Sequence, residues 1–429
     1  MMNTKSLFTW MFALLLSGAM QAQSYESFFT GDEADLDVEP NFGVVLMGGA
    51  GENDEAMKWF LERANGGDVV VLRASGSDGY NDYFFSDLGV TINSVETILF
   101  NDASAAEDPY VIEQVQHAEA IWMAGGNQWD YISYWRGTAI EDAINNLLNV
   151  RGGVVGGISA GMAIMGDAYF TAENGTVYSD EALEDPYNQY MTIGFNDFIE
   201  APFMENTITD THYDDPDRAG RHTTFLARMY QDYGVYPKGI ACDEYAAVCI
   251  DDAGIAWCYG EAPEYDDYVY FLRPNCDGPI GPEVCEAGQP LTWNDNNEAM
   301  KVYRINATFD GDQYMNLNNW TDFSGGEWFN GWAEAGVLGG AASDAPDCAV
   351  SITVSDFANA EFAIWPNPST GVLNIESPIG TQISIFHASG KVIQQLQTMS
   401  PIQQLDLSDL ASGVYLIQSG TQVTRVLIE

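Results

Sequence analysis

The chain has 429 residues, of which 63 are acidic and 15 basic, so its formal net charge is −48. Hydrophobic residues make up 46% of it, which is enough for a large core and excludes wholesale disorder. A chain this negative repels nucleic acid and anionic lipid, so we expect neither as a partner. The excess of acidic over basic residues is spread along the chain, which is typical of an acidic surface that keeps an exported protein soluble.

The N-terminus has the pattern of a signal peptide over residues 1–22. Lys5 supplies a positive charge, residues 7–16 are apolar, and small residues follow at 18–22. The apolar stretch is too short to span a bilayer comfortably, and no later segment supplies about 18 continuous apolar residues. We therefore expect an exported chain without stable membrane insertion.

Residues 42–160 alternate short apolar runs with amphipathic segments. Strands are expected at 43–47, 68–72, 94–100, 120–124 and 153–156, with helices at about 56–64 and 138–149. This βαβ rhythm predicts an α/β fold, a parallel sheet with helices on both faces. Further on, the pattern predicts a helix at 219–233 and a hairpin of strands 246–250 and 255–259.

The domain that starts at residue 23 is expected to run to 345, with a loop-rich extension from about 270, where Asn, Asp, Gly and Trp are frequent. A linker is predicted at 346–361. Residues 362–429 contain only four acidic side chains and show short alternating strands, which predicts a small all-β sandwich.

The six cysteines suit an oxidising compartment, and Cys276 and Cys285 flank a turn rich in Gly and Pro, which favours a disulfide between them. No Cys-x-x-Cys pair occurs, which argues against a zinc ribbon or a thioredoxin-like centre. We expect no metal and no organic cofactor. The acidic runs at 214–217 and 310–312 leave a calcium-stabilised loop open as a weaker hypothesis, although neither matches an EF-hand.

A nucleophile motif lies at the end of the last of these strands. Gly157-Ile158-Ser159-Ala160-Gly161 matches G-x-S-x-G, in which glycines permit a sharp turn that exposes the serine hydroxyl. The N–H groups that follow, at a helix N-terminus, can stabilise an oxyanion. The alternative to a catalytic motif is a tight strand-to-helix turn that needs small residues only for packing.

A serine nucleophile needs a base, and the chain has four histidines. His387 belongs to the C-terminal region, His117 ends a predicted helix, and His222 lies inside another. His212 follows an apolar stretch and precedes an acidic loop, so it is favoured by elimination and by position. For the carboxylate that orients the imidazole, Asp243-Glu244 and Glu173 both remain open.

These motifs together resemble the family of cyanophycinase and the aspartyl dipeptidase peptidase E, over roughly residues 40–310. The resemblance rests on five motifs in order: Gly48-Gly49, Ala124-Gly125-Gly126-Asn127-Gln128, the 157–161 elbow, Asp210-Thr211-His212 with Asp217-Arg218-Ala219-Gly220-Arg221, and Gly239-Ile240-Ala241-Cys242-Asp243-Glu244. It implies a flavodoxin-like three-layer α/β/α sandwich, similar to class I glutamine amidotransferases.

The resemblance also implies roles for single residues. The catalytic triad would be Ser159, His212 and Glu244, and the oxyanion would be held by the N–H groups of Gly126 and Ala160. The substrate-binding residues would be Gln128, Asp210, Arg218 and Arg221. A salt bridge at the start of a helix, with the nearby Asp residues, is an equally weighted alternative for the two arginines.

Two positions depart from cyanophycinase. Thr211 stands where that enzyme has Gln, and Pro216 where it has Arg, so specificity for cyanophycin itself is in doubt. The chain is expected to be a serine peptidase acting on a peptide or isopeptide bond, and a homodimer is possible. A secreted esterase or amidase with the same nucleophile, and an inactive binding protein on the same fold, are the alternatives.

The C-terminal residues have a resemblance of their own. Trp365-Pro366-Asn367-Pro368, the run 383–390 and the run 406–416 resemble the sorting domain of type IX secretion and cover nearly all of 362–429. This implies contact with the type IX machinery, export through the periplasm, and release or attachment at the cell surface.

Overall fold

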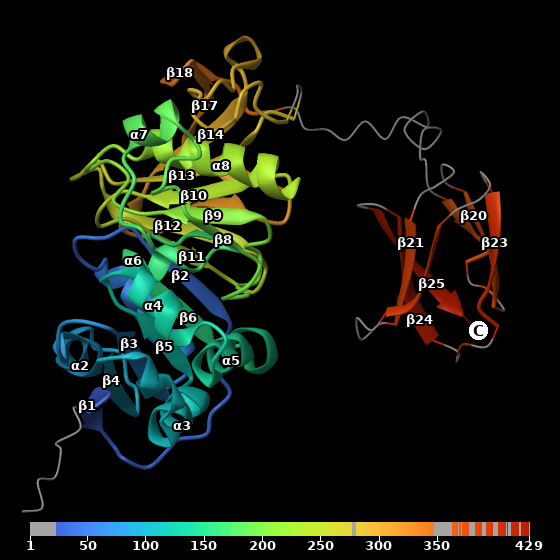
Figure 1. Ribbon diagram of the computed structural model, residues 1–429. Helices are drawn as coiled ribbons and strands as arrows, with labels where there is room; N and C mark the ends of the chain where they lie inside the picture. Colours follow the sequence, from blue (N-terminus) through green and yellow to red (C-terminus); the bar gives the residue numbers. More distant parts are fainter. Residues whose placement is uncertain are drawn as a thin grey trace, which may run out of the picture. The chain divides into compact units, whose positions relative to one another are not determined.

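The computed structural model describes residues 23–276 and 280–346, and near the C-terminus 363–367, 369, 371–376, 382–387, 392–397, 402–408, 410, 413–419 and 422–428. The chain divides into two compact units, Met1–Cys348 and Ala349–Glu429 (Figure 1). The predicted signal peptide lies outside the described residues, as does the predicted linker apart from Pro346.

A ten-stranded sheet forms the centre of the first unit. Five strands are parallel, in the order β4 (Ser94–Phe100), β3 (Asp68–Arg73), β5 (Ala120–Met123), β6 (Val154–Ile158) and β2 (Gly43–Met47). The antiparallel strands are β1 (Tyr25–Gly31) beside β4, and β11 (Ala247–Ile250), β12 (Ile255–Ala262), β15 (Gln313–Asn316) and β16 (Phe323–Ser324) beyond β2. Every residue of β2, β5 and β6 is buried, as continuous apolar runs predict for strands covered on both faces.

Helices cover both faces of the parallel strands. Met57 and Phe60 of α1 (Asp54–Arg63) pack with Val45 and Val71 on one face, next to α2 (Gly79–Asp82) and the helical turn Tyr83–Asp87. The other face is covered by α3 (Pro109–His117), α4 (Gln128–Trp135) and α5 (Ala139–Asn146), which continues into Leu147–Arg151, and by the short helix Ala103–Glu107. The predicted three-layer α/β/α arrangement is confirmed.

A second sheet of eight strands adjoins the antiparallel part of the first. Its order is β18 (Val337–Ser343), β17 (Glu327–Glu334), β14 (Met300–Asn306), β13 (Tyr268–Pro274), β10 (Lys238–Cys242), β9 (Thr207–Asp210), β7 (Ala168–Phe170) and β8 (Ile193–Phe195). Ile240 and Phe271 share a core with Val248 of the first sheet, and α8 (Ala219–Tyr233) packs Phe225 against Leu272. α7 (Ser179–Glu184) contacts α8, and Asp295–Asn297 is a short helical turn.

The region beyond residue 270 contains the strands β14 and β17, between long loops and turns. Tyr303, Ile305 and Trp328 alternate into the core at positions that become apparent only once β14 and β17 pair. The predicted disulfide is wrong: Cys276 is disulfide-bonded, whereas Cys285 is a free thiol. Cys285 packs in an apolar cluster, so its proximity to Cys276 in the sequence does not make the two cysteines partners in the fold.

The second unit is all-β, as predicted. Three strands pair in the order β19 (Ala363–Trp365), β20 (Val372–Glu376) and β23 (Ile402–Asp406). Four others pair in the order β22 (Val392–Gln397), β21 (Gln382–His387), β24 (Gly413–Ser419) and β25 (Gln422–Ile428), and Leu373, Ile385 and Ile417 are among the core residues.

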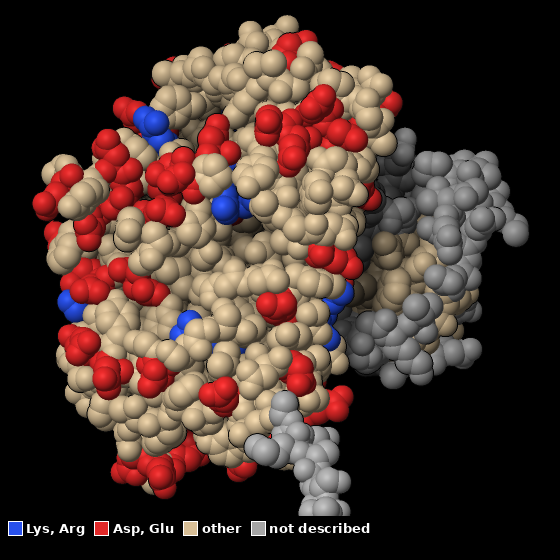
Figure 2. Space-filling view, turned by 60° about the vertical axis from the view of Figure 1, so that its left-hand side comes forward, with Lys and Arg blue, Asp and Glu red and all other residues tan. Residues whose placement is uncertain are grey.

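Acidic side chains are dispersed over the face of the molecule in Figure 2, with few Lys and Arg among them. Within the described part of the chain, no helix is long and apolar enough to cross a membrane.

Candidate active site

Ser159 lies on a sharp turn between β6 and α6 (Ala160–Ala163), with φ of 52° and ψ of −110°. Glycines make this turn possible. A Cβ on Gly157 would lie 2.5 Å from the carbonyl carbon of Gly161, and one on Gly161 would lie 2.1 Å from the carbonyl oxygen of Met123. The strand–turn–helix context that the elbow motif requires is therefore present.

The structure brings together three of the residues that the family resemblance had singled out. Ser159 Oγ lies 2.9 Å from His212 Nε2, and His212 Nδ1 lies 2.6 Å from Glu244 Oε1. His212 follows β9 and Glu244 follows β10 by two residues, and these two strands are parallel neighbours. Because parallel strands end at the same edge of a sheet, His212 and Glu244 lie next to each other. Ser159, His212 and Glu244 thus form one chain of hydrogen bonds, in the same order as in the sequence.

Gly48 and Gly49, directly after β2, hold the two loops that carry the imidazole and the carboxylate. The N–H of His212 donates to Gly48 O at 3.0 Å, and the N–H of Tyr245 donates to Gly49 O at 3.1 Å. A Cβ on Gly48 would lie 1.9 Å from Asp243 O. The Gly48-Gly49 pair stood among the family motifs, but its supporting role could not be deduced from spacing.

The rival carboxylate and the other histidines lie elsewhere. Glu173 lines the same cavity as Ser159, and the hydrogen bond that its N–H donates is to Thr171 Oγ1, at 3.3 Å. His117 Nδ1 lies 3.0 Å from Oδ2 of the exposed Asp35. His222 is fully buried, and burial lowers its pKa to about 4, which keeps the ring neutral. His387 ends β21 in the other unit.

A cavity of about 440 Å³ lies against Ser159 and His212. The loop after β5 passes beside the serine, because a Cβ on Gly125 would lie 3.7 Å from Ser159 Cβ. Gly126 and Gln128 of this loop line the cavity, and Gln128 Nε2 donates to Phe170 O at 3.2 Å. Ala160 is the first residue of α6, so its N–H has no acceptor within the helix.

The two predicted substrate arginines differ in their surroundings. Arg221 Nε and Nη2 donate to the two carboxylate oxygens of Asp210, at 2.9 and 2.5 Å, and Nη1 donates to Thr176 Oγ1 and Val177 O. Only 5% of the Arg221 side chain is exposed. Burial by itself would raise the pKa of Asp210, but the charge and hydrogen bonds of Arg221 outweigh it and hold that pKa below its usual value.

Arg218 is the freer of the pair. Its Nη1 donates to Thr211 O at 2.8 Å, while its Nε is buried without a hydrogen-bond partner among the described residues. Burial, followed by the charge of Arg221, lowers the pKa of Arg218 to about 10, so the guanidinium remains charged at neutral pH. Arg218, Arg221 and Thr211 line the cavity, and Asp210 stands behind them.

No group of three or more His, Cys, Asp or Glu side chains is arranged to hold a metal ion in the part of the chain that the structure describes.

Residues 47–257, the stretch that holds Ser159, His212 and Glu244, match the model of peptidase family S51. Residues 363–428 match the model of the secretion system C-terminal sorting domain. The chain carries a family S51 peptidase domain. The resemblance to cyanophycinase and peptidase E is thus confirmed, and the sorting domain directs this peptidase through type IX secretion to the cell surface or beyond it.

Three known proteins are similar to parts of this chain. The chain is 24% identical to cyanophycinase of Geminocystis herdmanii over 241 residues, which cover 52% of this chain and 83% of that protein. It is 27% identical to beta-agarase A of Zobellia galactanivorans over 84 residues, only 19% of this chain and 16% of the agarase. A crystal structure of a peptidase from an acI-B1 Actinobacterium aligns at 14% identity and a TM-score of 0.39, over 54% of this chain and 91% of that one.

Proposed function

We propose that this family S51 domain is a serine peptidase in which Ser159 attacks the peptide carbonyl and His212 and Glu244 activate it. The observation that carries the proposal is the unbroken line from Ser159 Oγ to His212 Nε2 at 2.9 Å and from His212 Nδ1 to Glu244 Oε1 at 2.6 Å. This is the arrangement that nucleophile, base and orienting acid require.

The reaction follows from these contacts. Ser159 Oγ forms a bond to the carbonyl carbon while His212 Nε2 takes its proton, and the same nitrogen then protonates the leaving amine as the C–N bond breaks. Water, deprotonated by His212, hydrolyses the acyl-enzyme and restores the serine. Glu244 keeps Nδ1 protonated and stabilises the imidazolium. The N–H groups of Gly126 and Ala160 are the proposed oxyanion donors, and each such donor contributes about 3 kcal/mol.

The cavity favours an acidic group near the scissile bond. Arg218 lines the cavity with Ser159, its guanidinium is charged, and 20% of its side chain is exposed, so a substrate carboxylate could pair with it. Arg221 uses four of its five N–H donors on Asp210, Thr176 and Val177, and it therefore positions the loop around Thr176 rather than the substrate. Gln128 lines the same cavity as Arg218. We propose acidic or isoaspartyl-like peptides as substrates.

The test is covalent labelling of the full chain by a fluorophosphonate, followed by mass spectrometry. The expected result is one adduct on Ser159, with no adduct in Ser159→Ala. The matched control is Ser133→Ala, because Ser133 lies on the exposed side of α4 and bonds only to Asp130 O in the described structure. An unlabelled but folded wild type would favour the inactive binding protein.

Labelling alone does not separate a peptidase from an esterase or amidase. Purified wild type should therefore be compared on matched acidic and neutral dipeptides and on aryl esters. Cleavage of the acidic dipeptides, absent in Ser159→Ala, supports the peptidase. Turnover of esters alone would reject it in favour of the esterase.

A further inference from the structure

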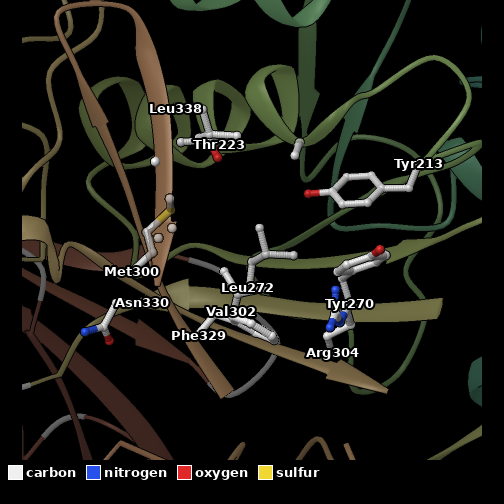
Figure 3. A pocket seen from close by; sticks show the side chains of 14 residues that line it. Tyr213, Thr223, Tyr270, Leu272, Met300, Val302, Arg304, Phe329, Asn330 and Leu338 are labelled. Carbon is white, nitrogen blue, oxygen red and sulfur yellow. The ribbon is translucent and has the colours of Figure 1, made fainter. Parts of the chain in front are cut away.

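A second cavity, of about 190 Å³, lies in the second sheet beside the segment that carries His212 (Figure 3). Thr211, His212 and Arg218 line the catalytic cavity, whereas Tyr213, Ala219 and Thr223 line this one. The two cavities share no lining residue, so the loop after β9 and the first turns of α8 form a wall between them. We call the second one the sheet cavity.

The body of the sheet cavity is apolar. Leu272 of β13, Met300 and Val302 of β14, and Leu338 of β18 face its open centre. Glycines on β17 and β18 leave the space unfilled, since a Cβ on Gly340 would meet nothing nearer than 3.5 Å. Apolar cavities of about 150 Å³ accommodate a benzene molecule, so this one is large enough for a phenyl ring with a short chain.

The chain has 63 acidic residues, yet among the described residues that line the sheet cavity the charged side chain is the cation Arg304. The Arg304 guanidinium stacks on Tyr268 and Phe329, with Cζ 4.6 and 4.7 Å from the ring centroids. Its ion pair with Glu327 is 3.3 Å long and the carboxylate is 71% exposed, so a ligand can replace it at little cost.

We propose that the sheet cavity is a binding site for small carboxylic acids with an apolar body, the body lying among Leu272, Met300, Val302 and Leu338 and the carboxylate on Arg304. Apolar burial and a charge-assisted bond to a preoriented guanidinium are the two interactions that such a ligand combines. The site is separate from Ser159, and the proposal does not depend on peptidase activity.

The first experiment measures binding of 3-phenylpropionate and of its neutral analogue 3-phenylpropanamide to the full chain by calorimetry. We expect the acid to bind about tenfold more tightly than the amide, and Arg304→Gln to remove that difference without changing amide binding. Equal affinity of acid and amide in the wild type would overturn the proposal.

The second experiment places the ligand. Gly340→Val adds bulk on the face of β18 that carries Leu338, and a β-branched residue suits a strand, so the fold should be kept while binding is lost. The matched control is Ala341→Val, which adds similar bulk to the opposite, exposed face. Arg218→Met should leave binding unchanged. Loss of binding in Arg218→Met, or full binding in Gly340→Val, would assign the probe to another site and reject the proposal.

Discussion

Gly49 lies directly against the imidazole of His212. A Cβ added at residue 49 would lie 2.3 Å from both Cε1 and Nε2 of that ring, and the φ of Gly49 is +144°, which side-chain-bearing residues rarely adopt. Gly49, which follows β2, therefore leaves the space that the imidazole occupies beside Ser159.

Gly49→Ala should displace His212 and separate Nε2 from the serine. Because a misplacement of about 1 Å costs about 10²-fold in rate, we expect at least that fall in fluorophosphonate labelling of Ser159, with the circular dichroism spectrum retained. Gly89→Ala is the matched control, since Gly89 also has positive φ, +73°, but open space around it. Equal labelling rates in the two variants would contradict the supporting role.

Glu244→Gln tests the orienting acid. The amide preserves size but can place the wrong hydrogen on Nδ1, and the equivalent change in a serine protease lowers kcat about 10⁴-fold. We expect a loss of that order in the hydrolysis of an acidic dipeptide, and Glu173→Gln should keep kcat within a few-fold. The reverse result, with Glu173→Gln inactive, would move the third role to Glu173.

Arg221→Met should destabilise the fold. The substitution leaves Asp210 buried without a cation at hydrogen-bond distance, because Arg218 Nη1 lies 4.0 Å from its Oδ1. Removing one member of a buried ion pair costs about 3–5 kcal/mol. Unfolding in urea measures the loss, and Lys58→Met is the control, because the Lys58–Glu55 pair is partly exposed and contributes at most about 1 kcal/mol. Asp210→Asn introduced into Arg221→Met should recover much of the stability.

The same pair gives a pH dependence. The pKa of Asp210 is held below its usual 3.8, so its contribution to stability is present above that value and is lost as the pH falls through the lower folded pKa. The stability gap between wild type and Arg221→Met should therefore be wide at pH 7 and narrow toward pH 3. A gap that stayed constant would show that the charge of Asp210 is not what Arg221 stabilises.

Arg218→Met should change substrate binding rather than chemistry. We expect KM for an acidic dipeptide to rise about tenfold or more, because a charge-assisted bond is lost, while a neutral fluorophosphonate labels Ser159 at an unchanged rate. Arg218→Lys should restore part of the affinity. An unchanged KM would remove Arg218 from the substrate site.

Asp243 should make the fold less stable as the pH rises. Burial, followed by the charge of Asp214, raises its pKa from 3.8 to about 7. Between these values the unfolded chain releases a proton that the folded chain keeps, so folding stability falls as the pH rises from about 4 to about 7. Urea unfolding at pH 5 and pH 8 should show this fall in wild type, and a smaller one in Asp243→Asn.

The amide in Asp243→Asn keeps an oxygen to accept from Tyr268 N–H, which the carboxylate does at 3.1 Å, so the fold should tolerate it. Asp87→Asn, on an exposed turn, should behave as wild type. If Asp243→Asn and Asp87→Asn showed the same dependence on pH, the fall would have to be assigned to other carboxylates.

Short sequence patterns determined much of the fold of this protein. The apolar strands 43–47 and 68–72 and the glycines around Ser159 are signals carried by a few consecutive residues, because sheet burial and a tight turn impose their demands locally. Elimination among the histidines favoured His212, the family motifs favoured Glu244, and the type IX resemblance predicted export.

Only the tertiary structure decided questions that depend on distance between remote residues. It placed Glu244 rather than Glu173 on His212, because β9 and β10 end side by side. It separated Arg221, which pairs with Asp210 through two hydrogen bonds, from Arg218, whose Nε lacks a partner among the described residues, although both lie at the start of one helix. It also paired β14 with β17 within the expected loop-rich extension, which buries residues that no local pattern marks as core, because strand partners are chosen by packing across the sheet.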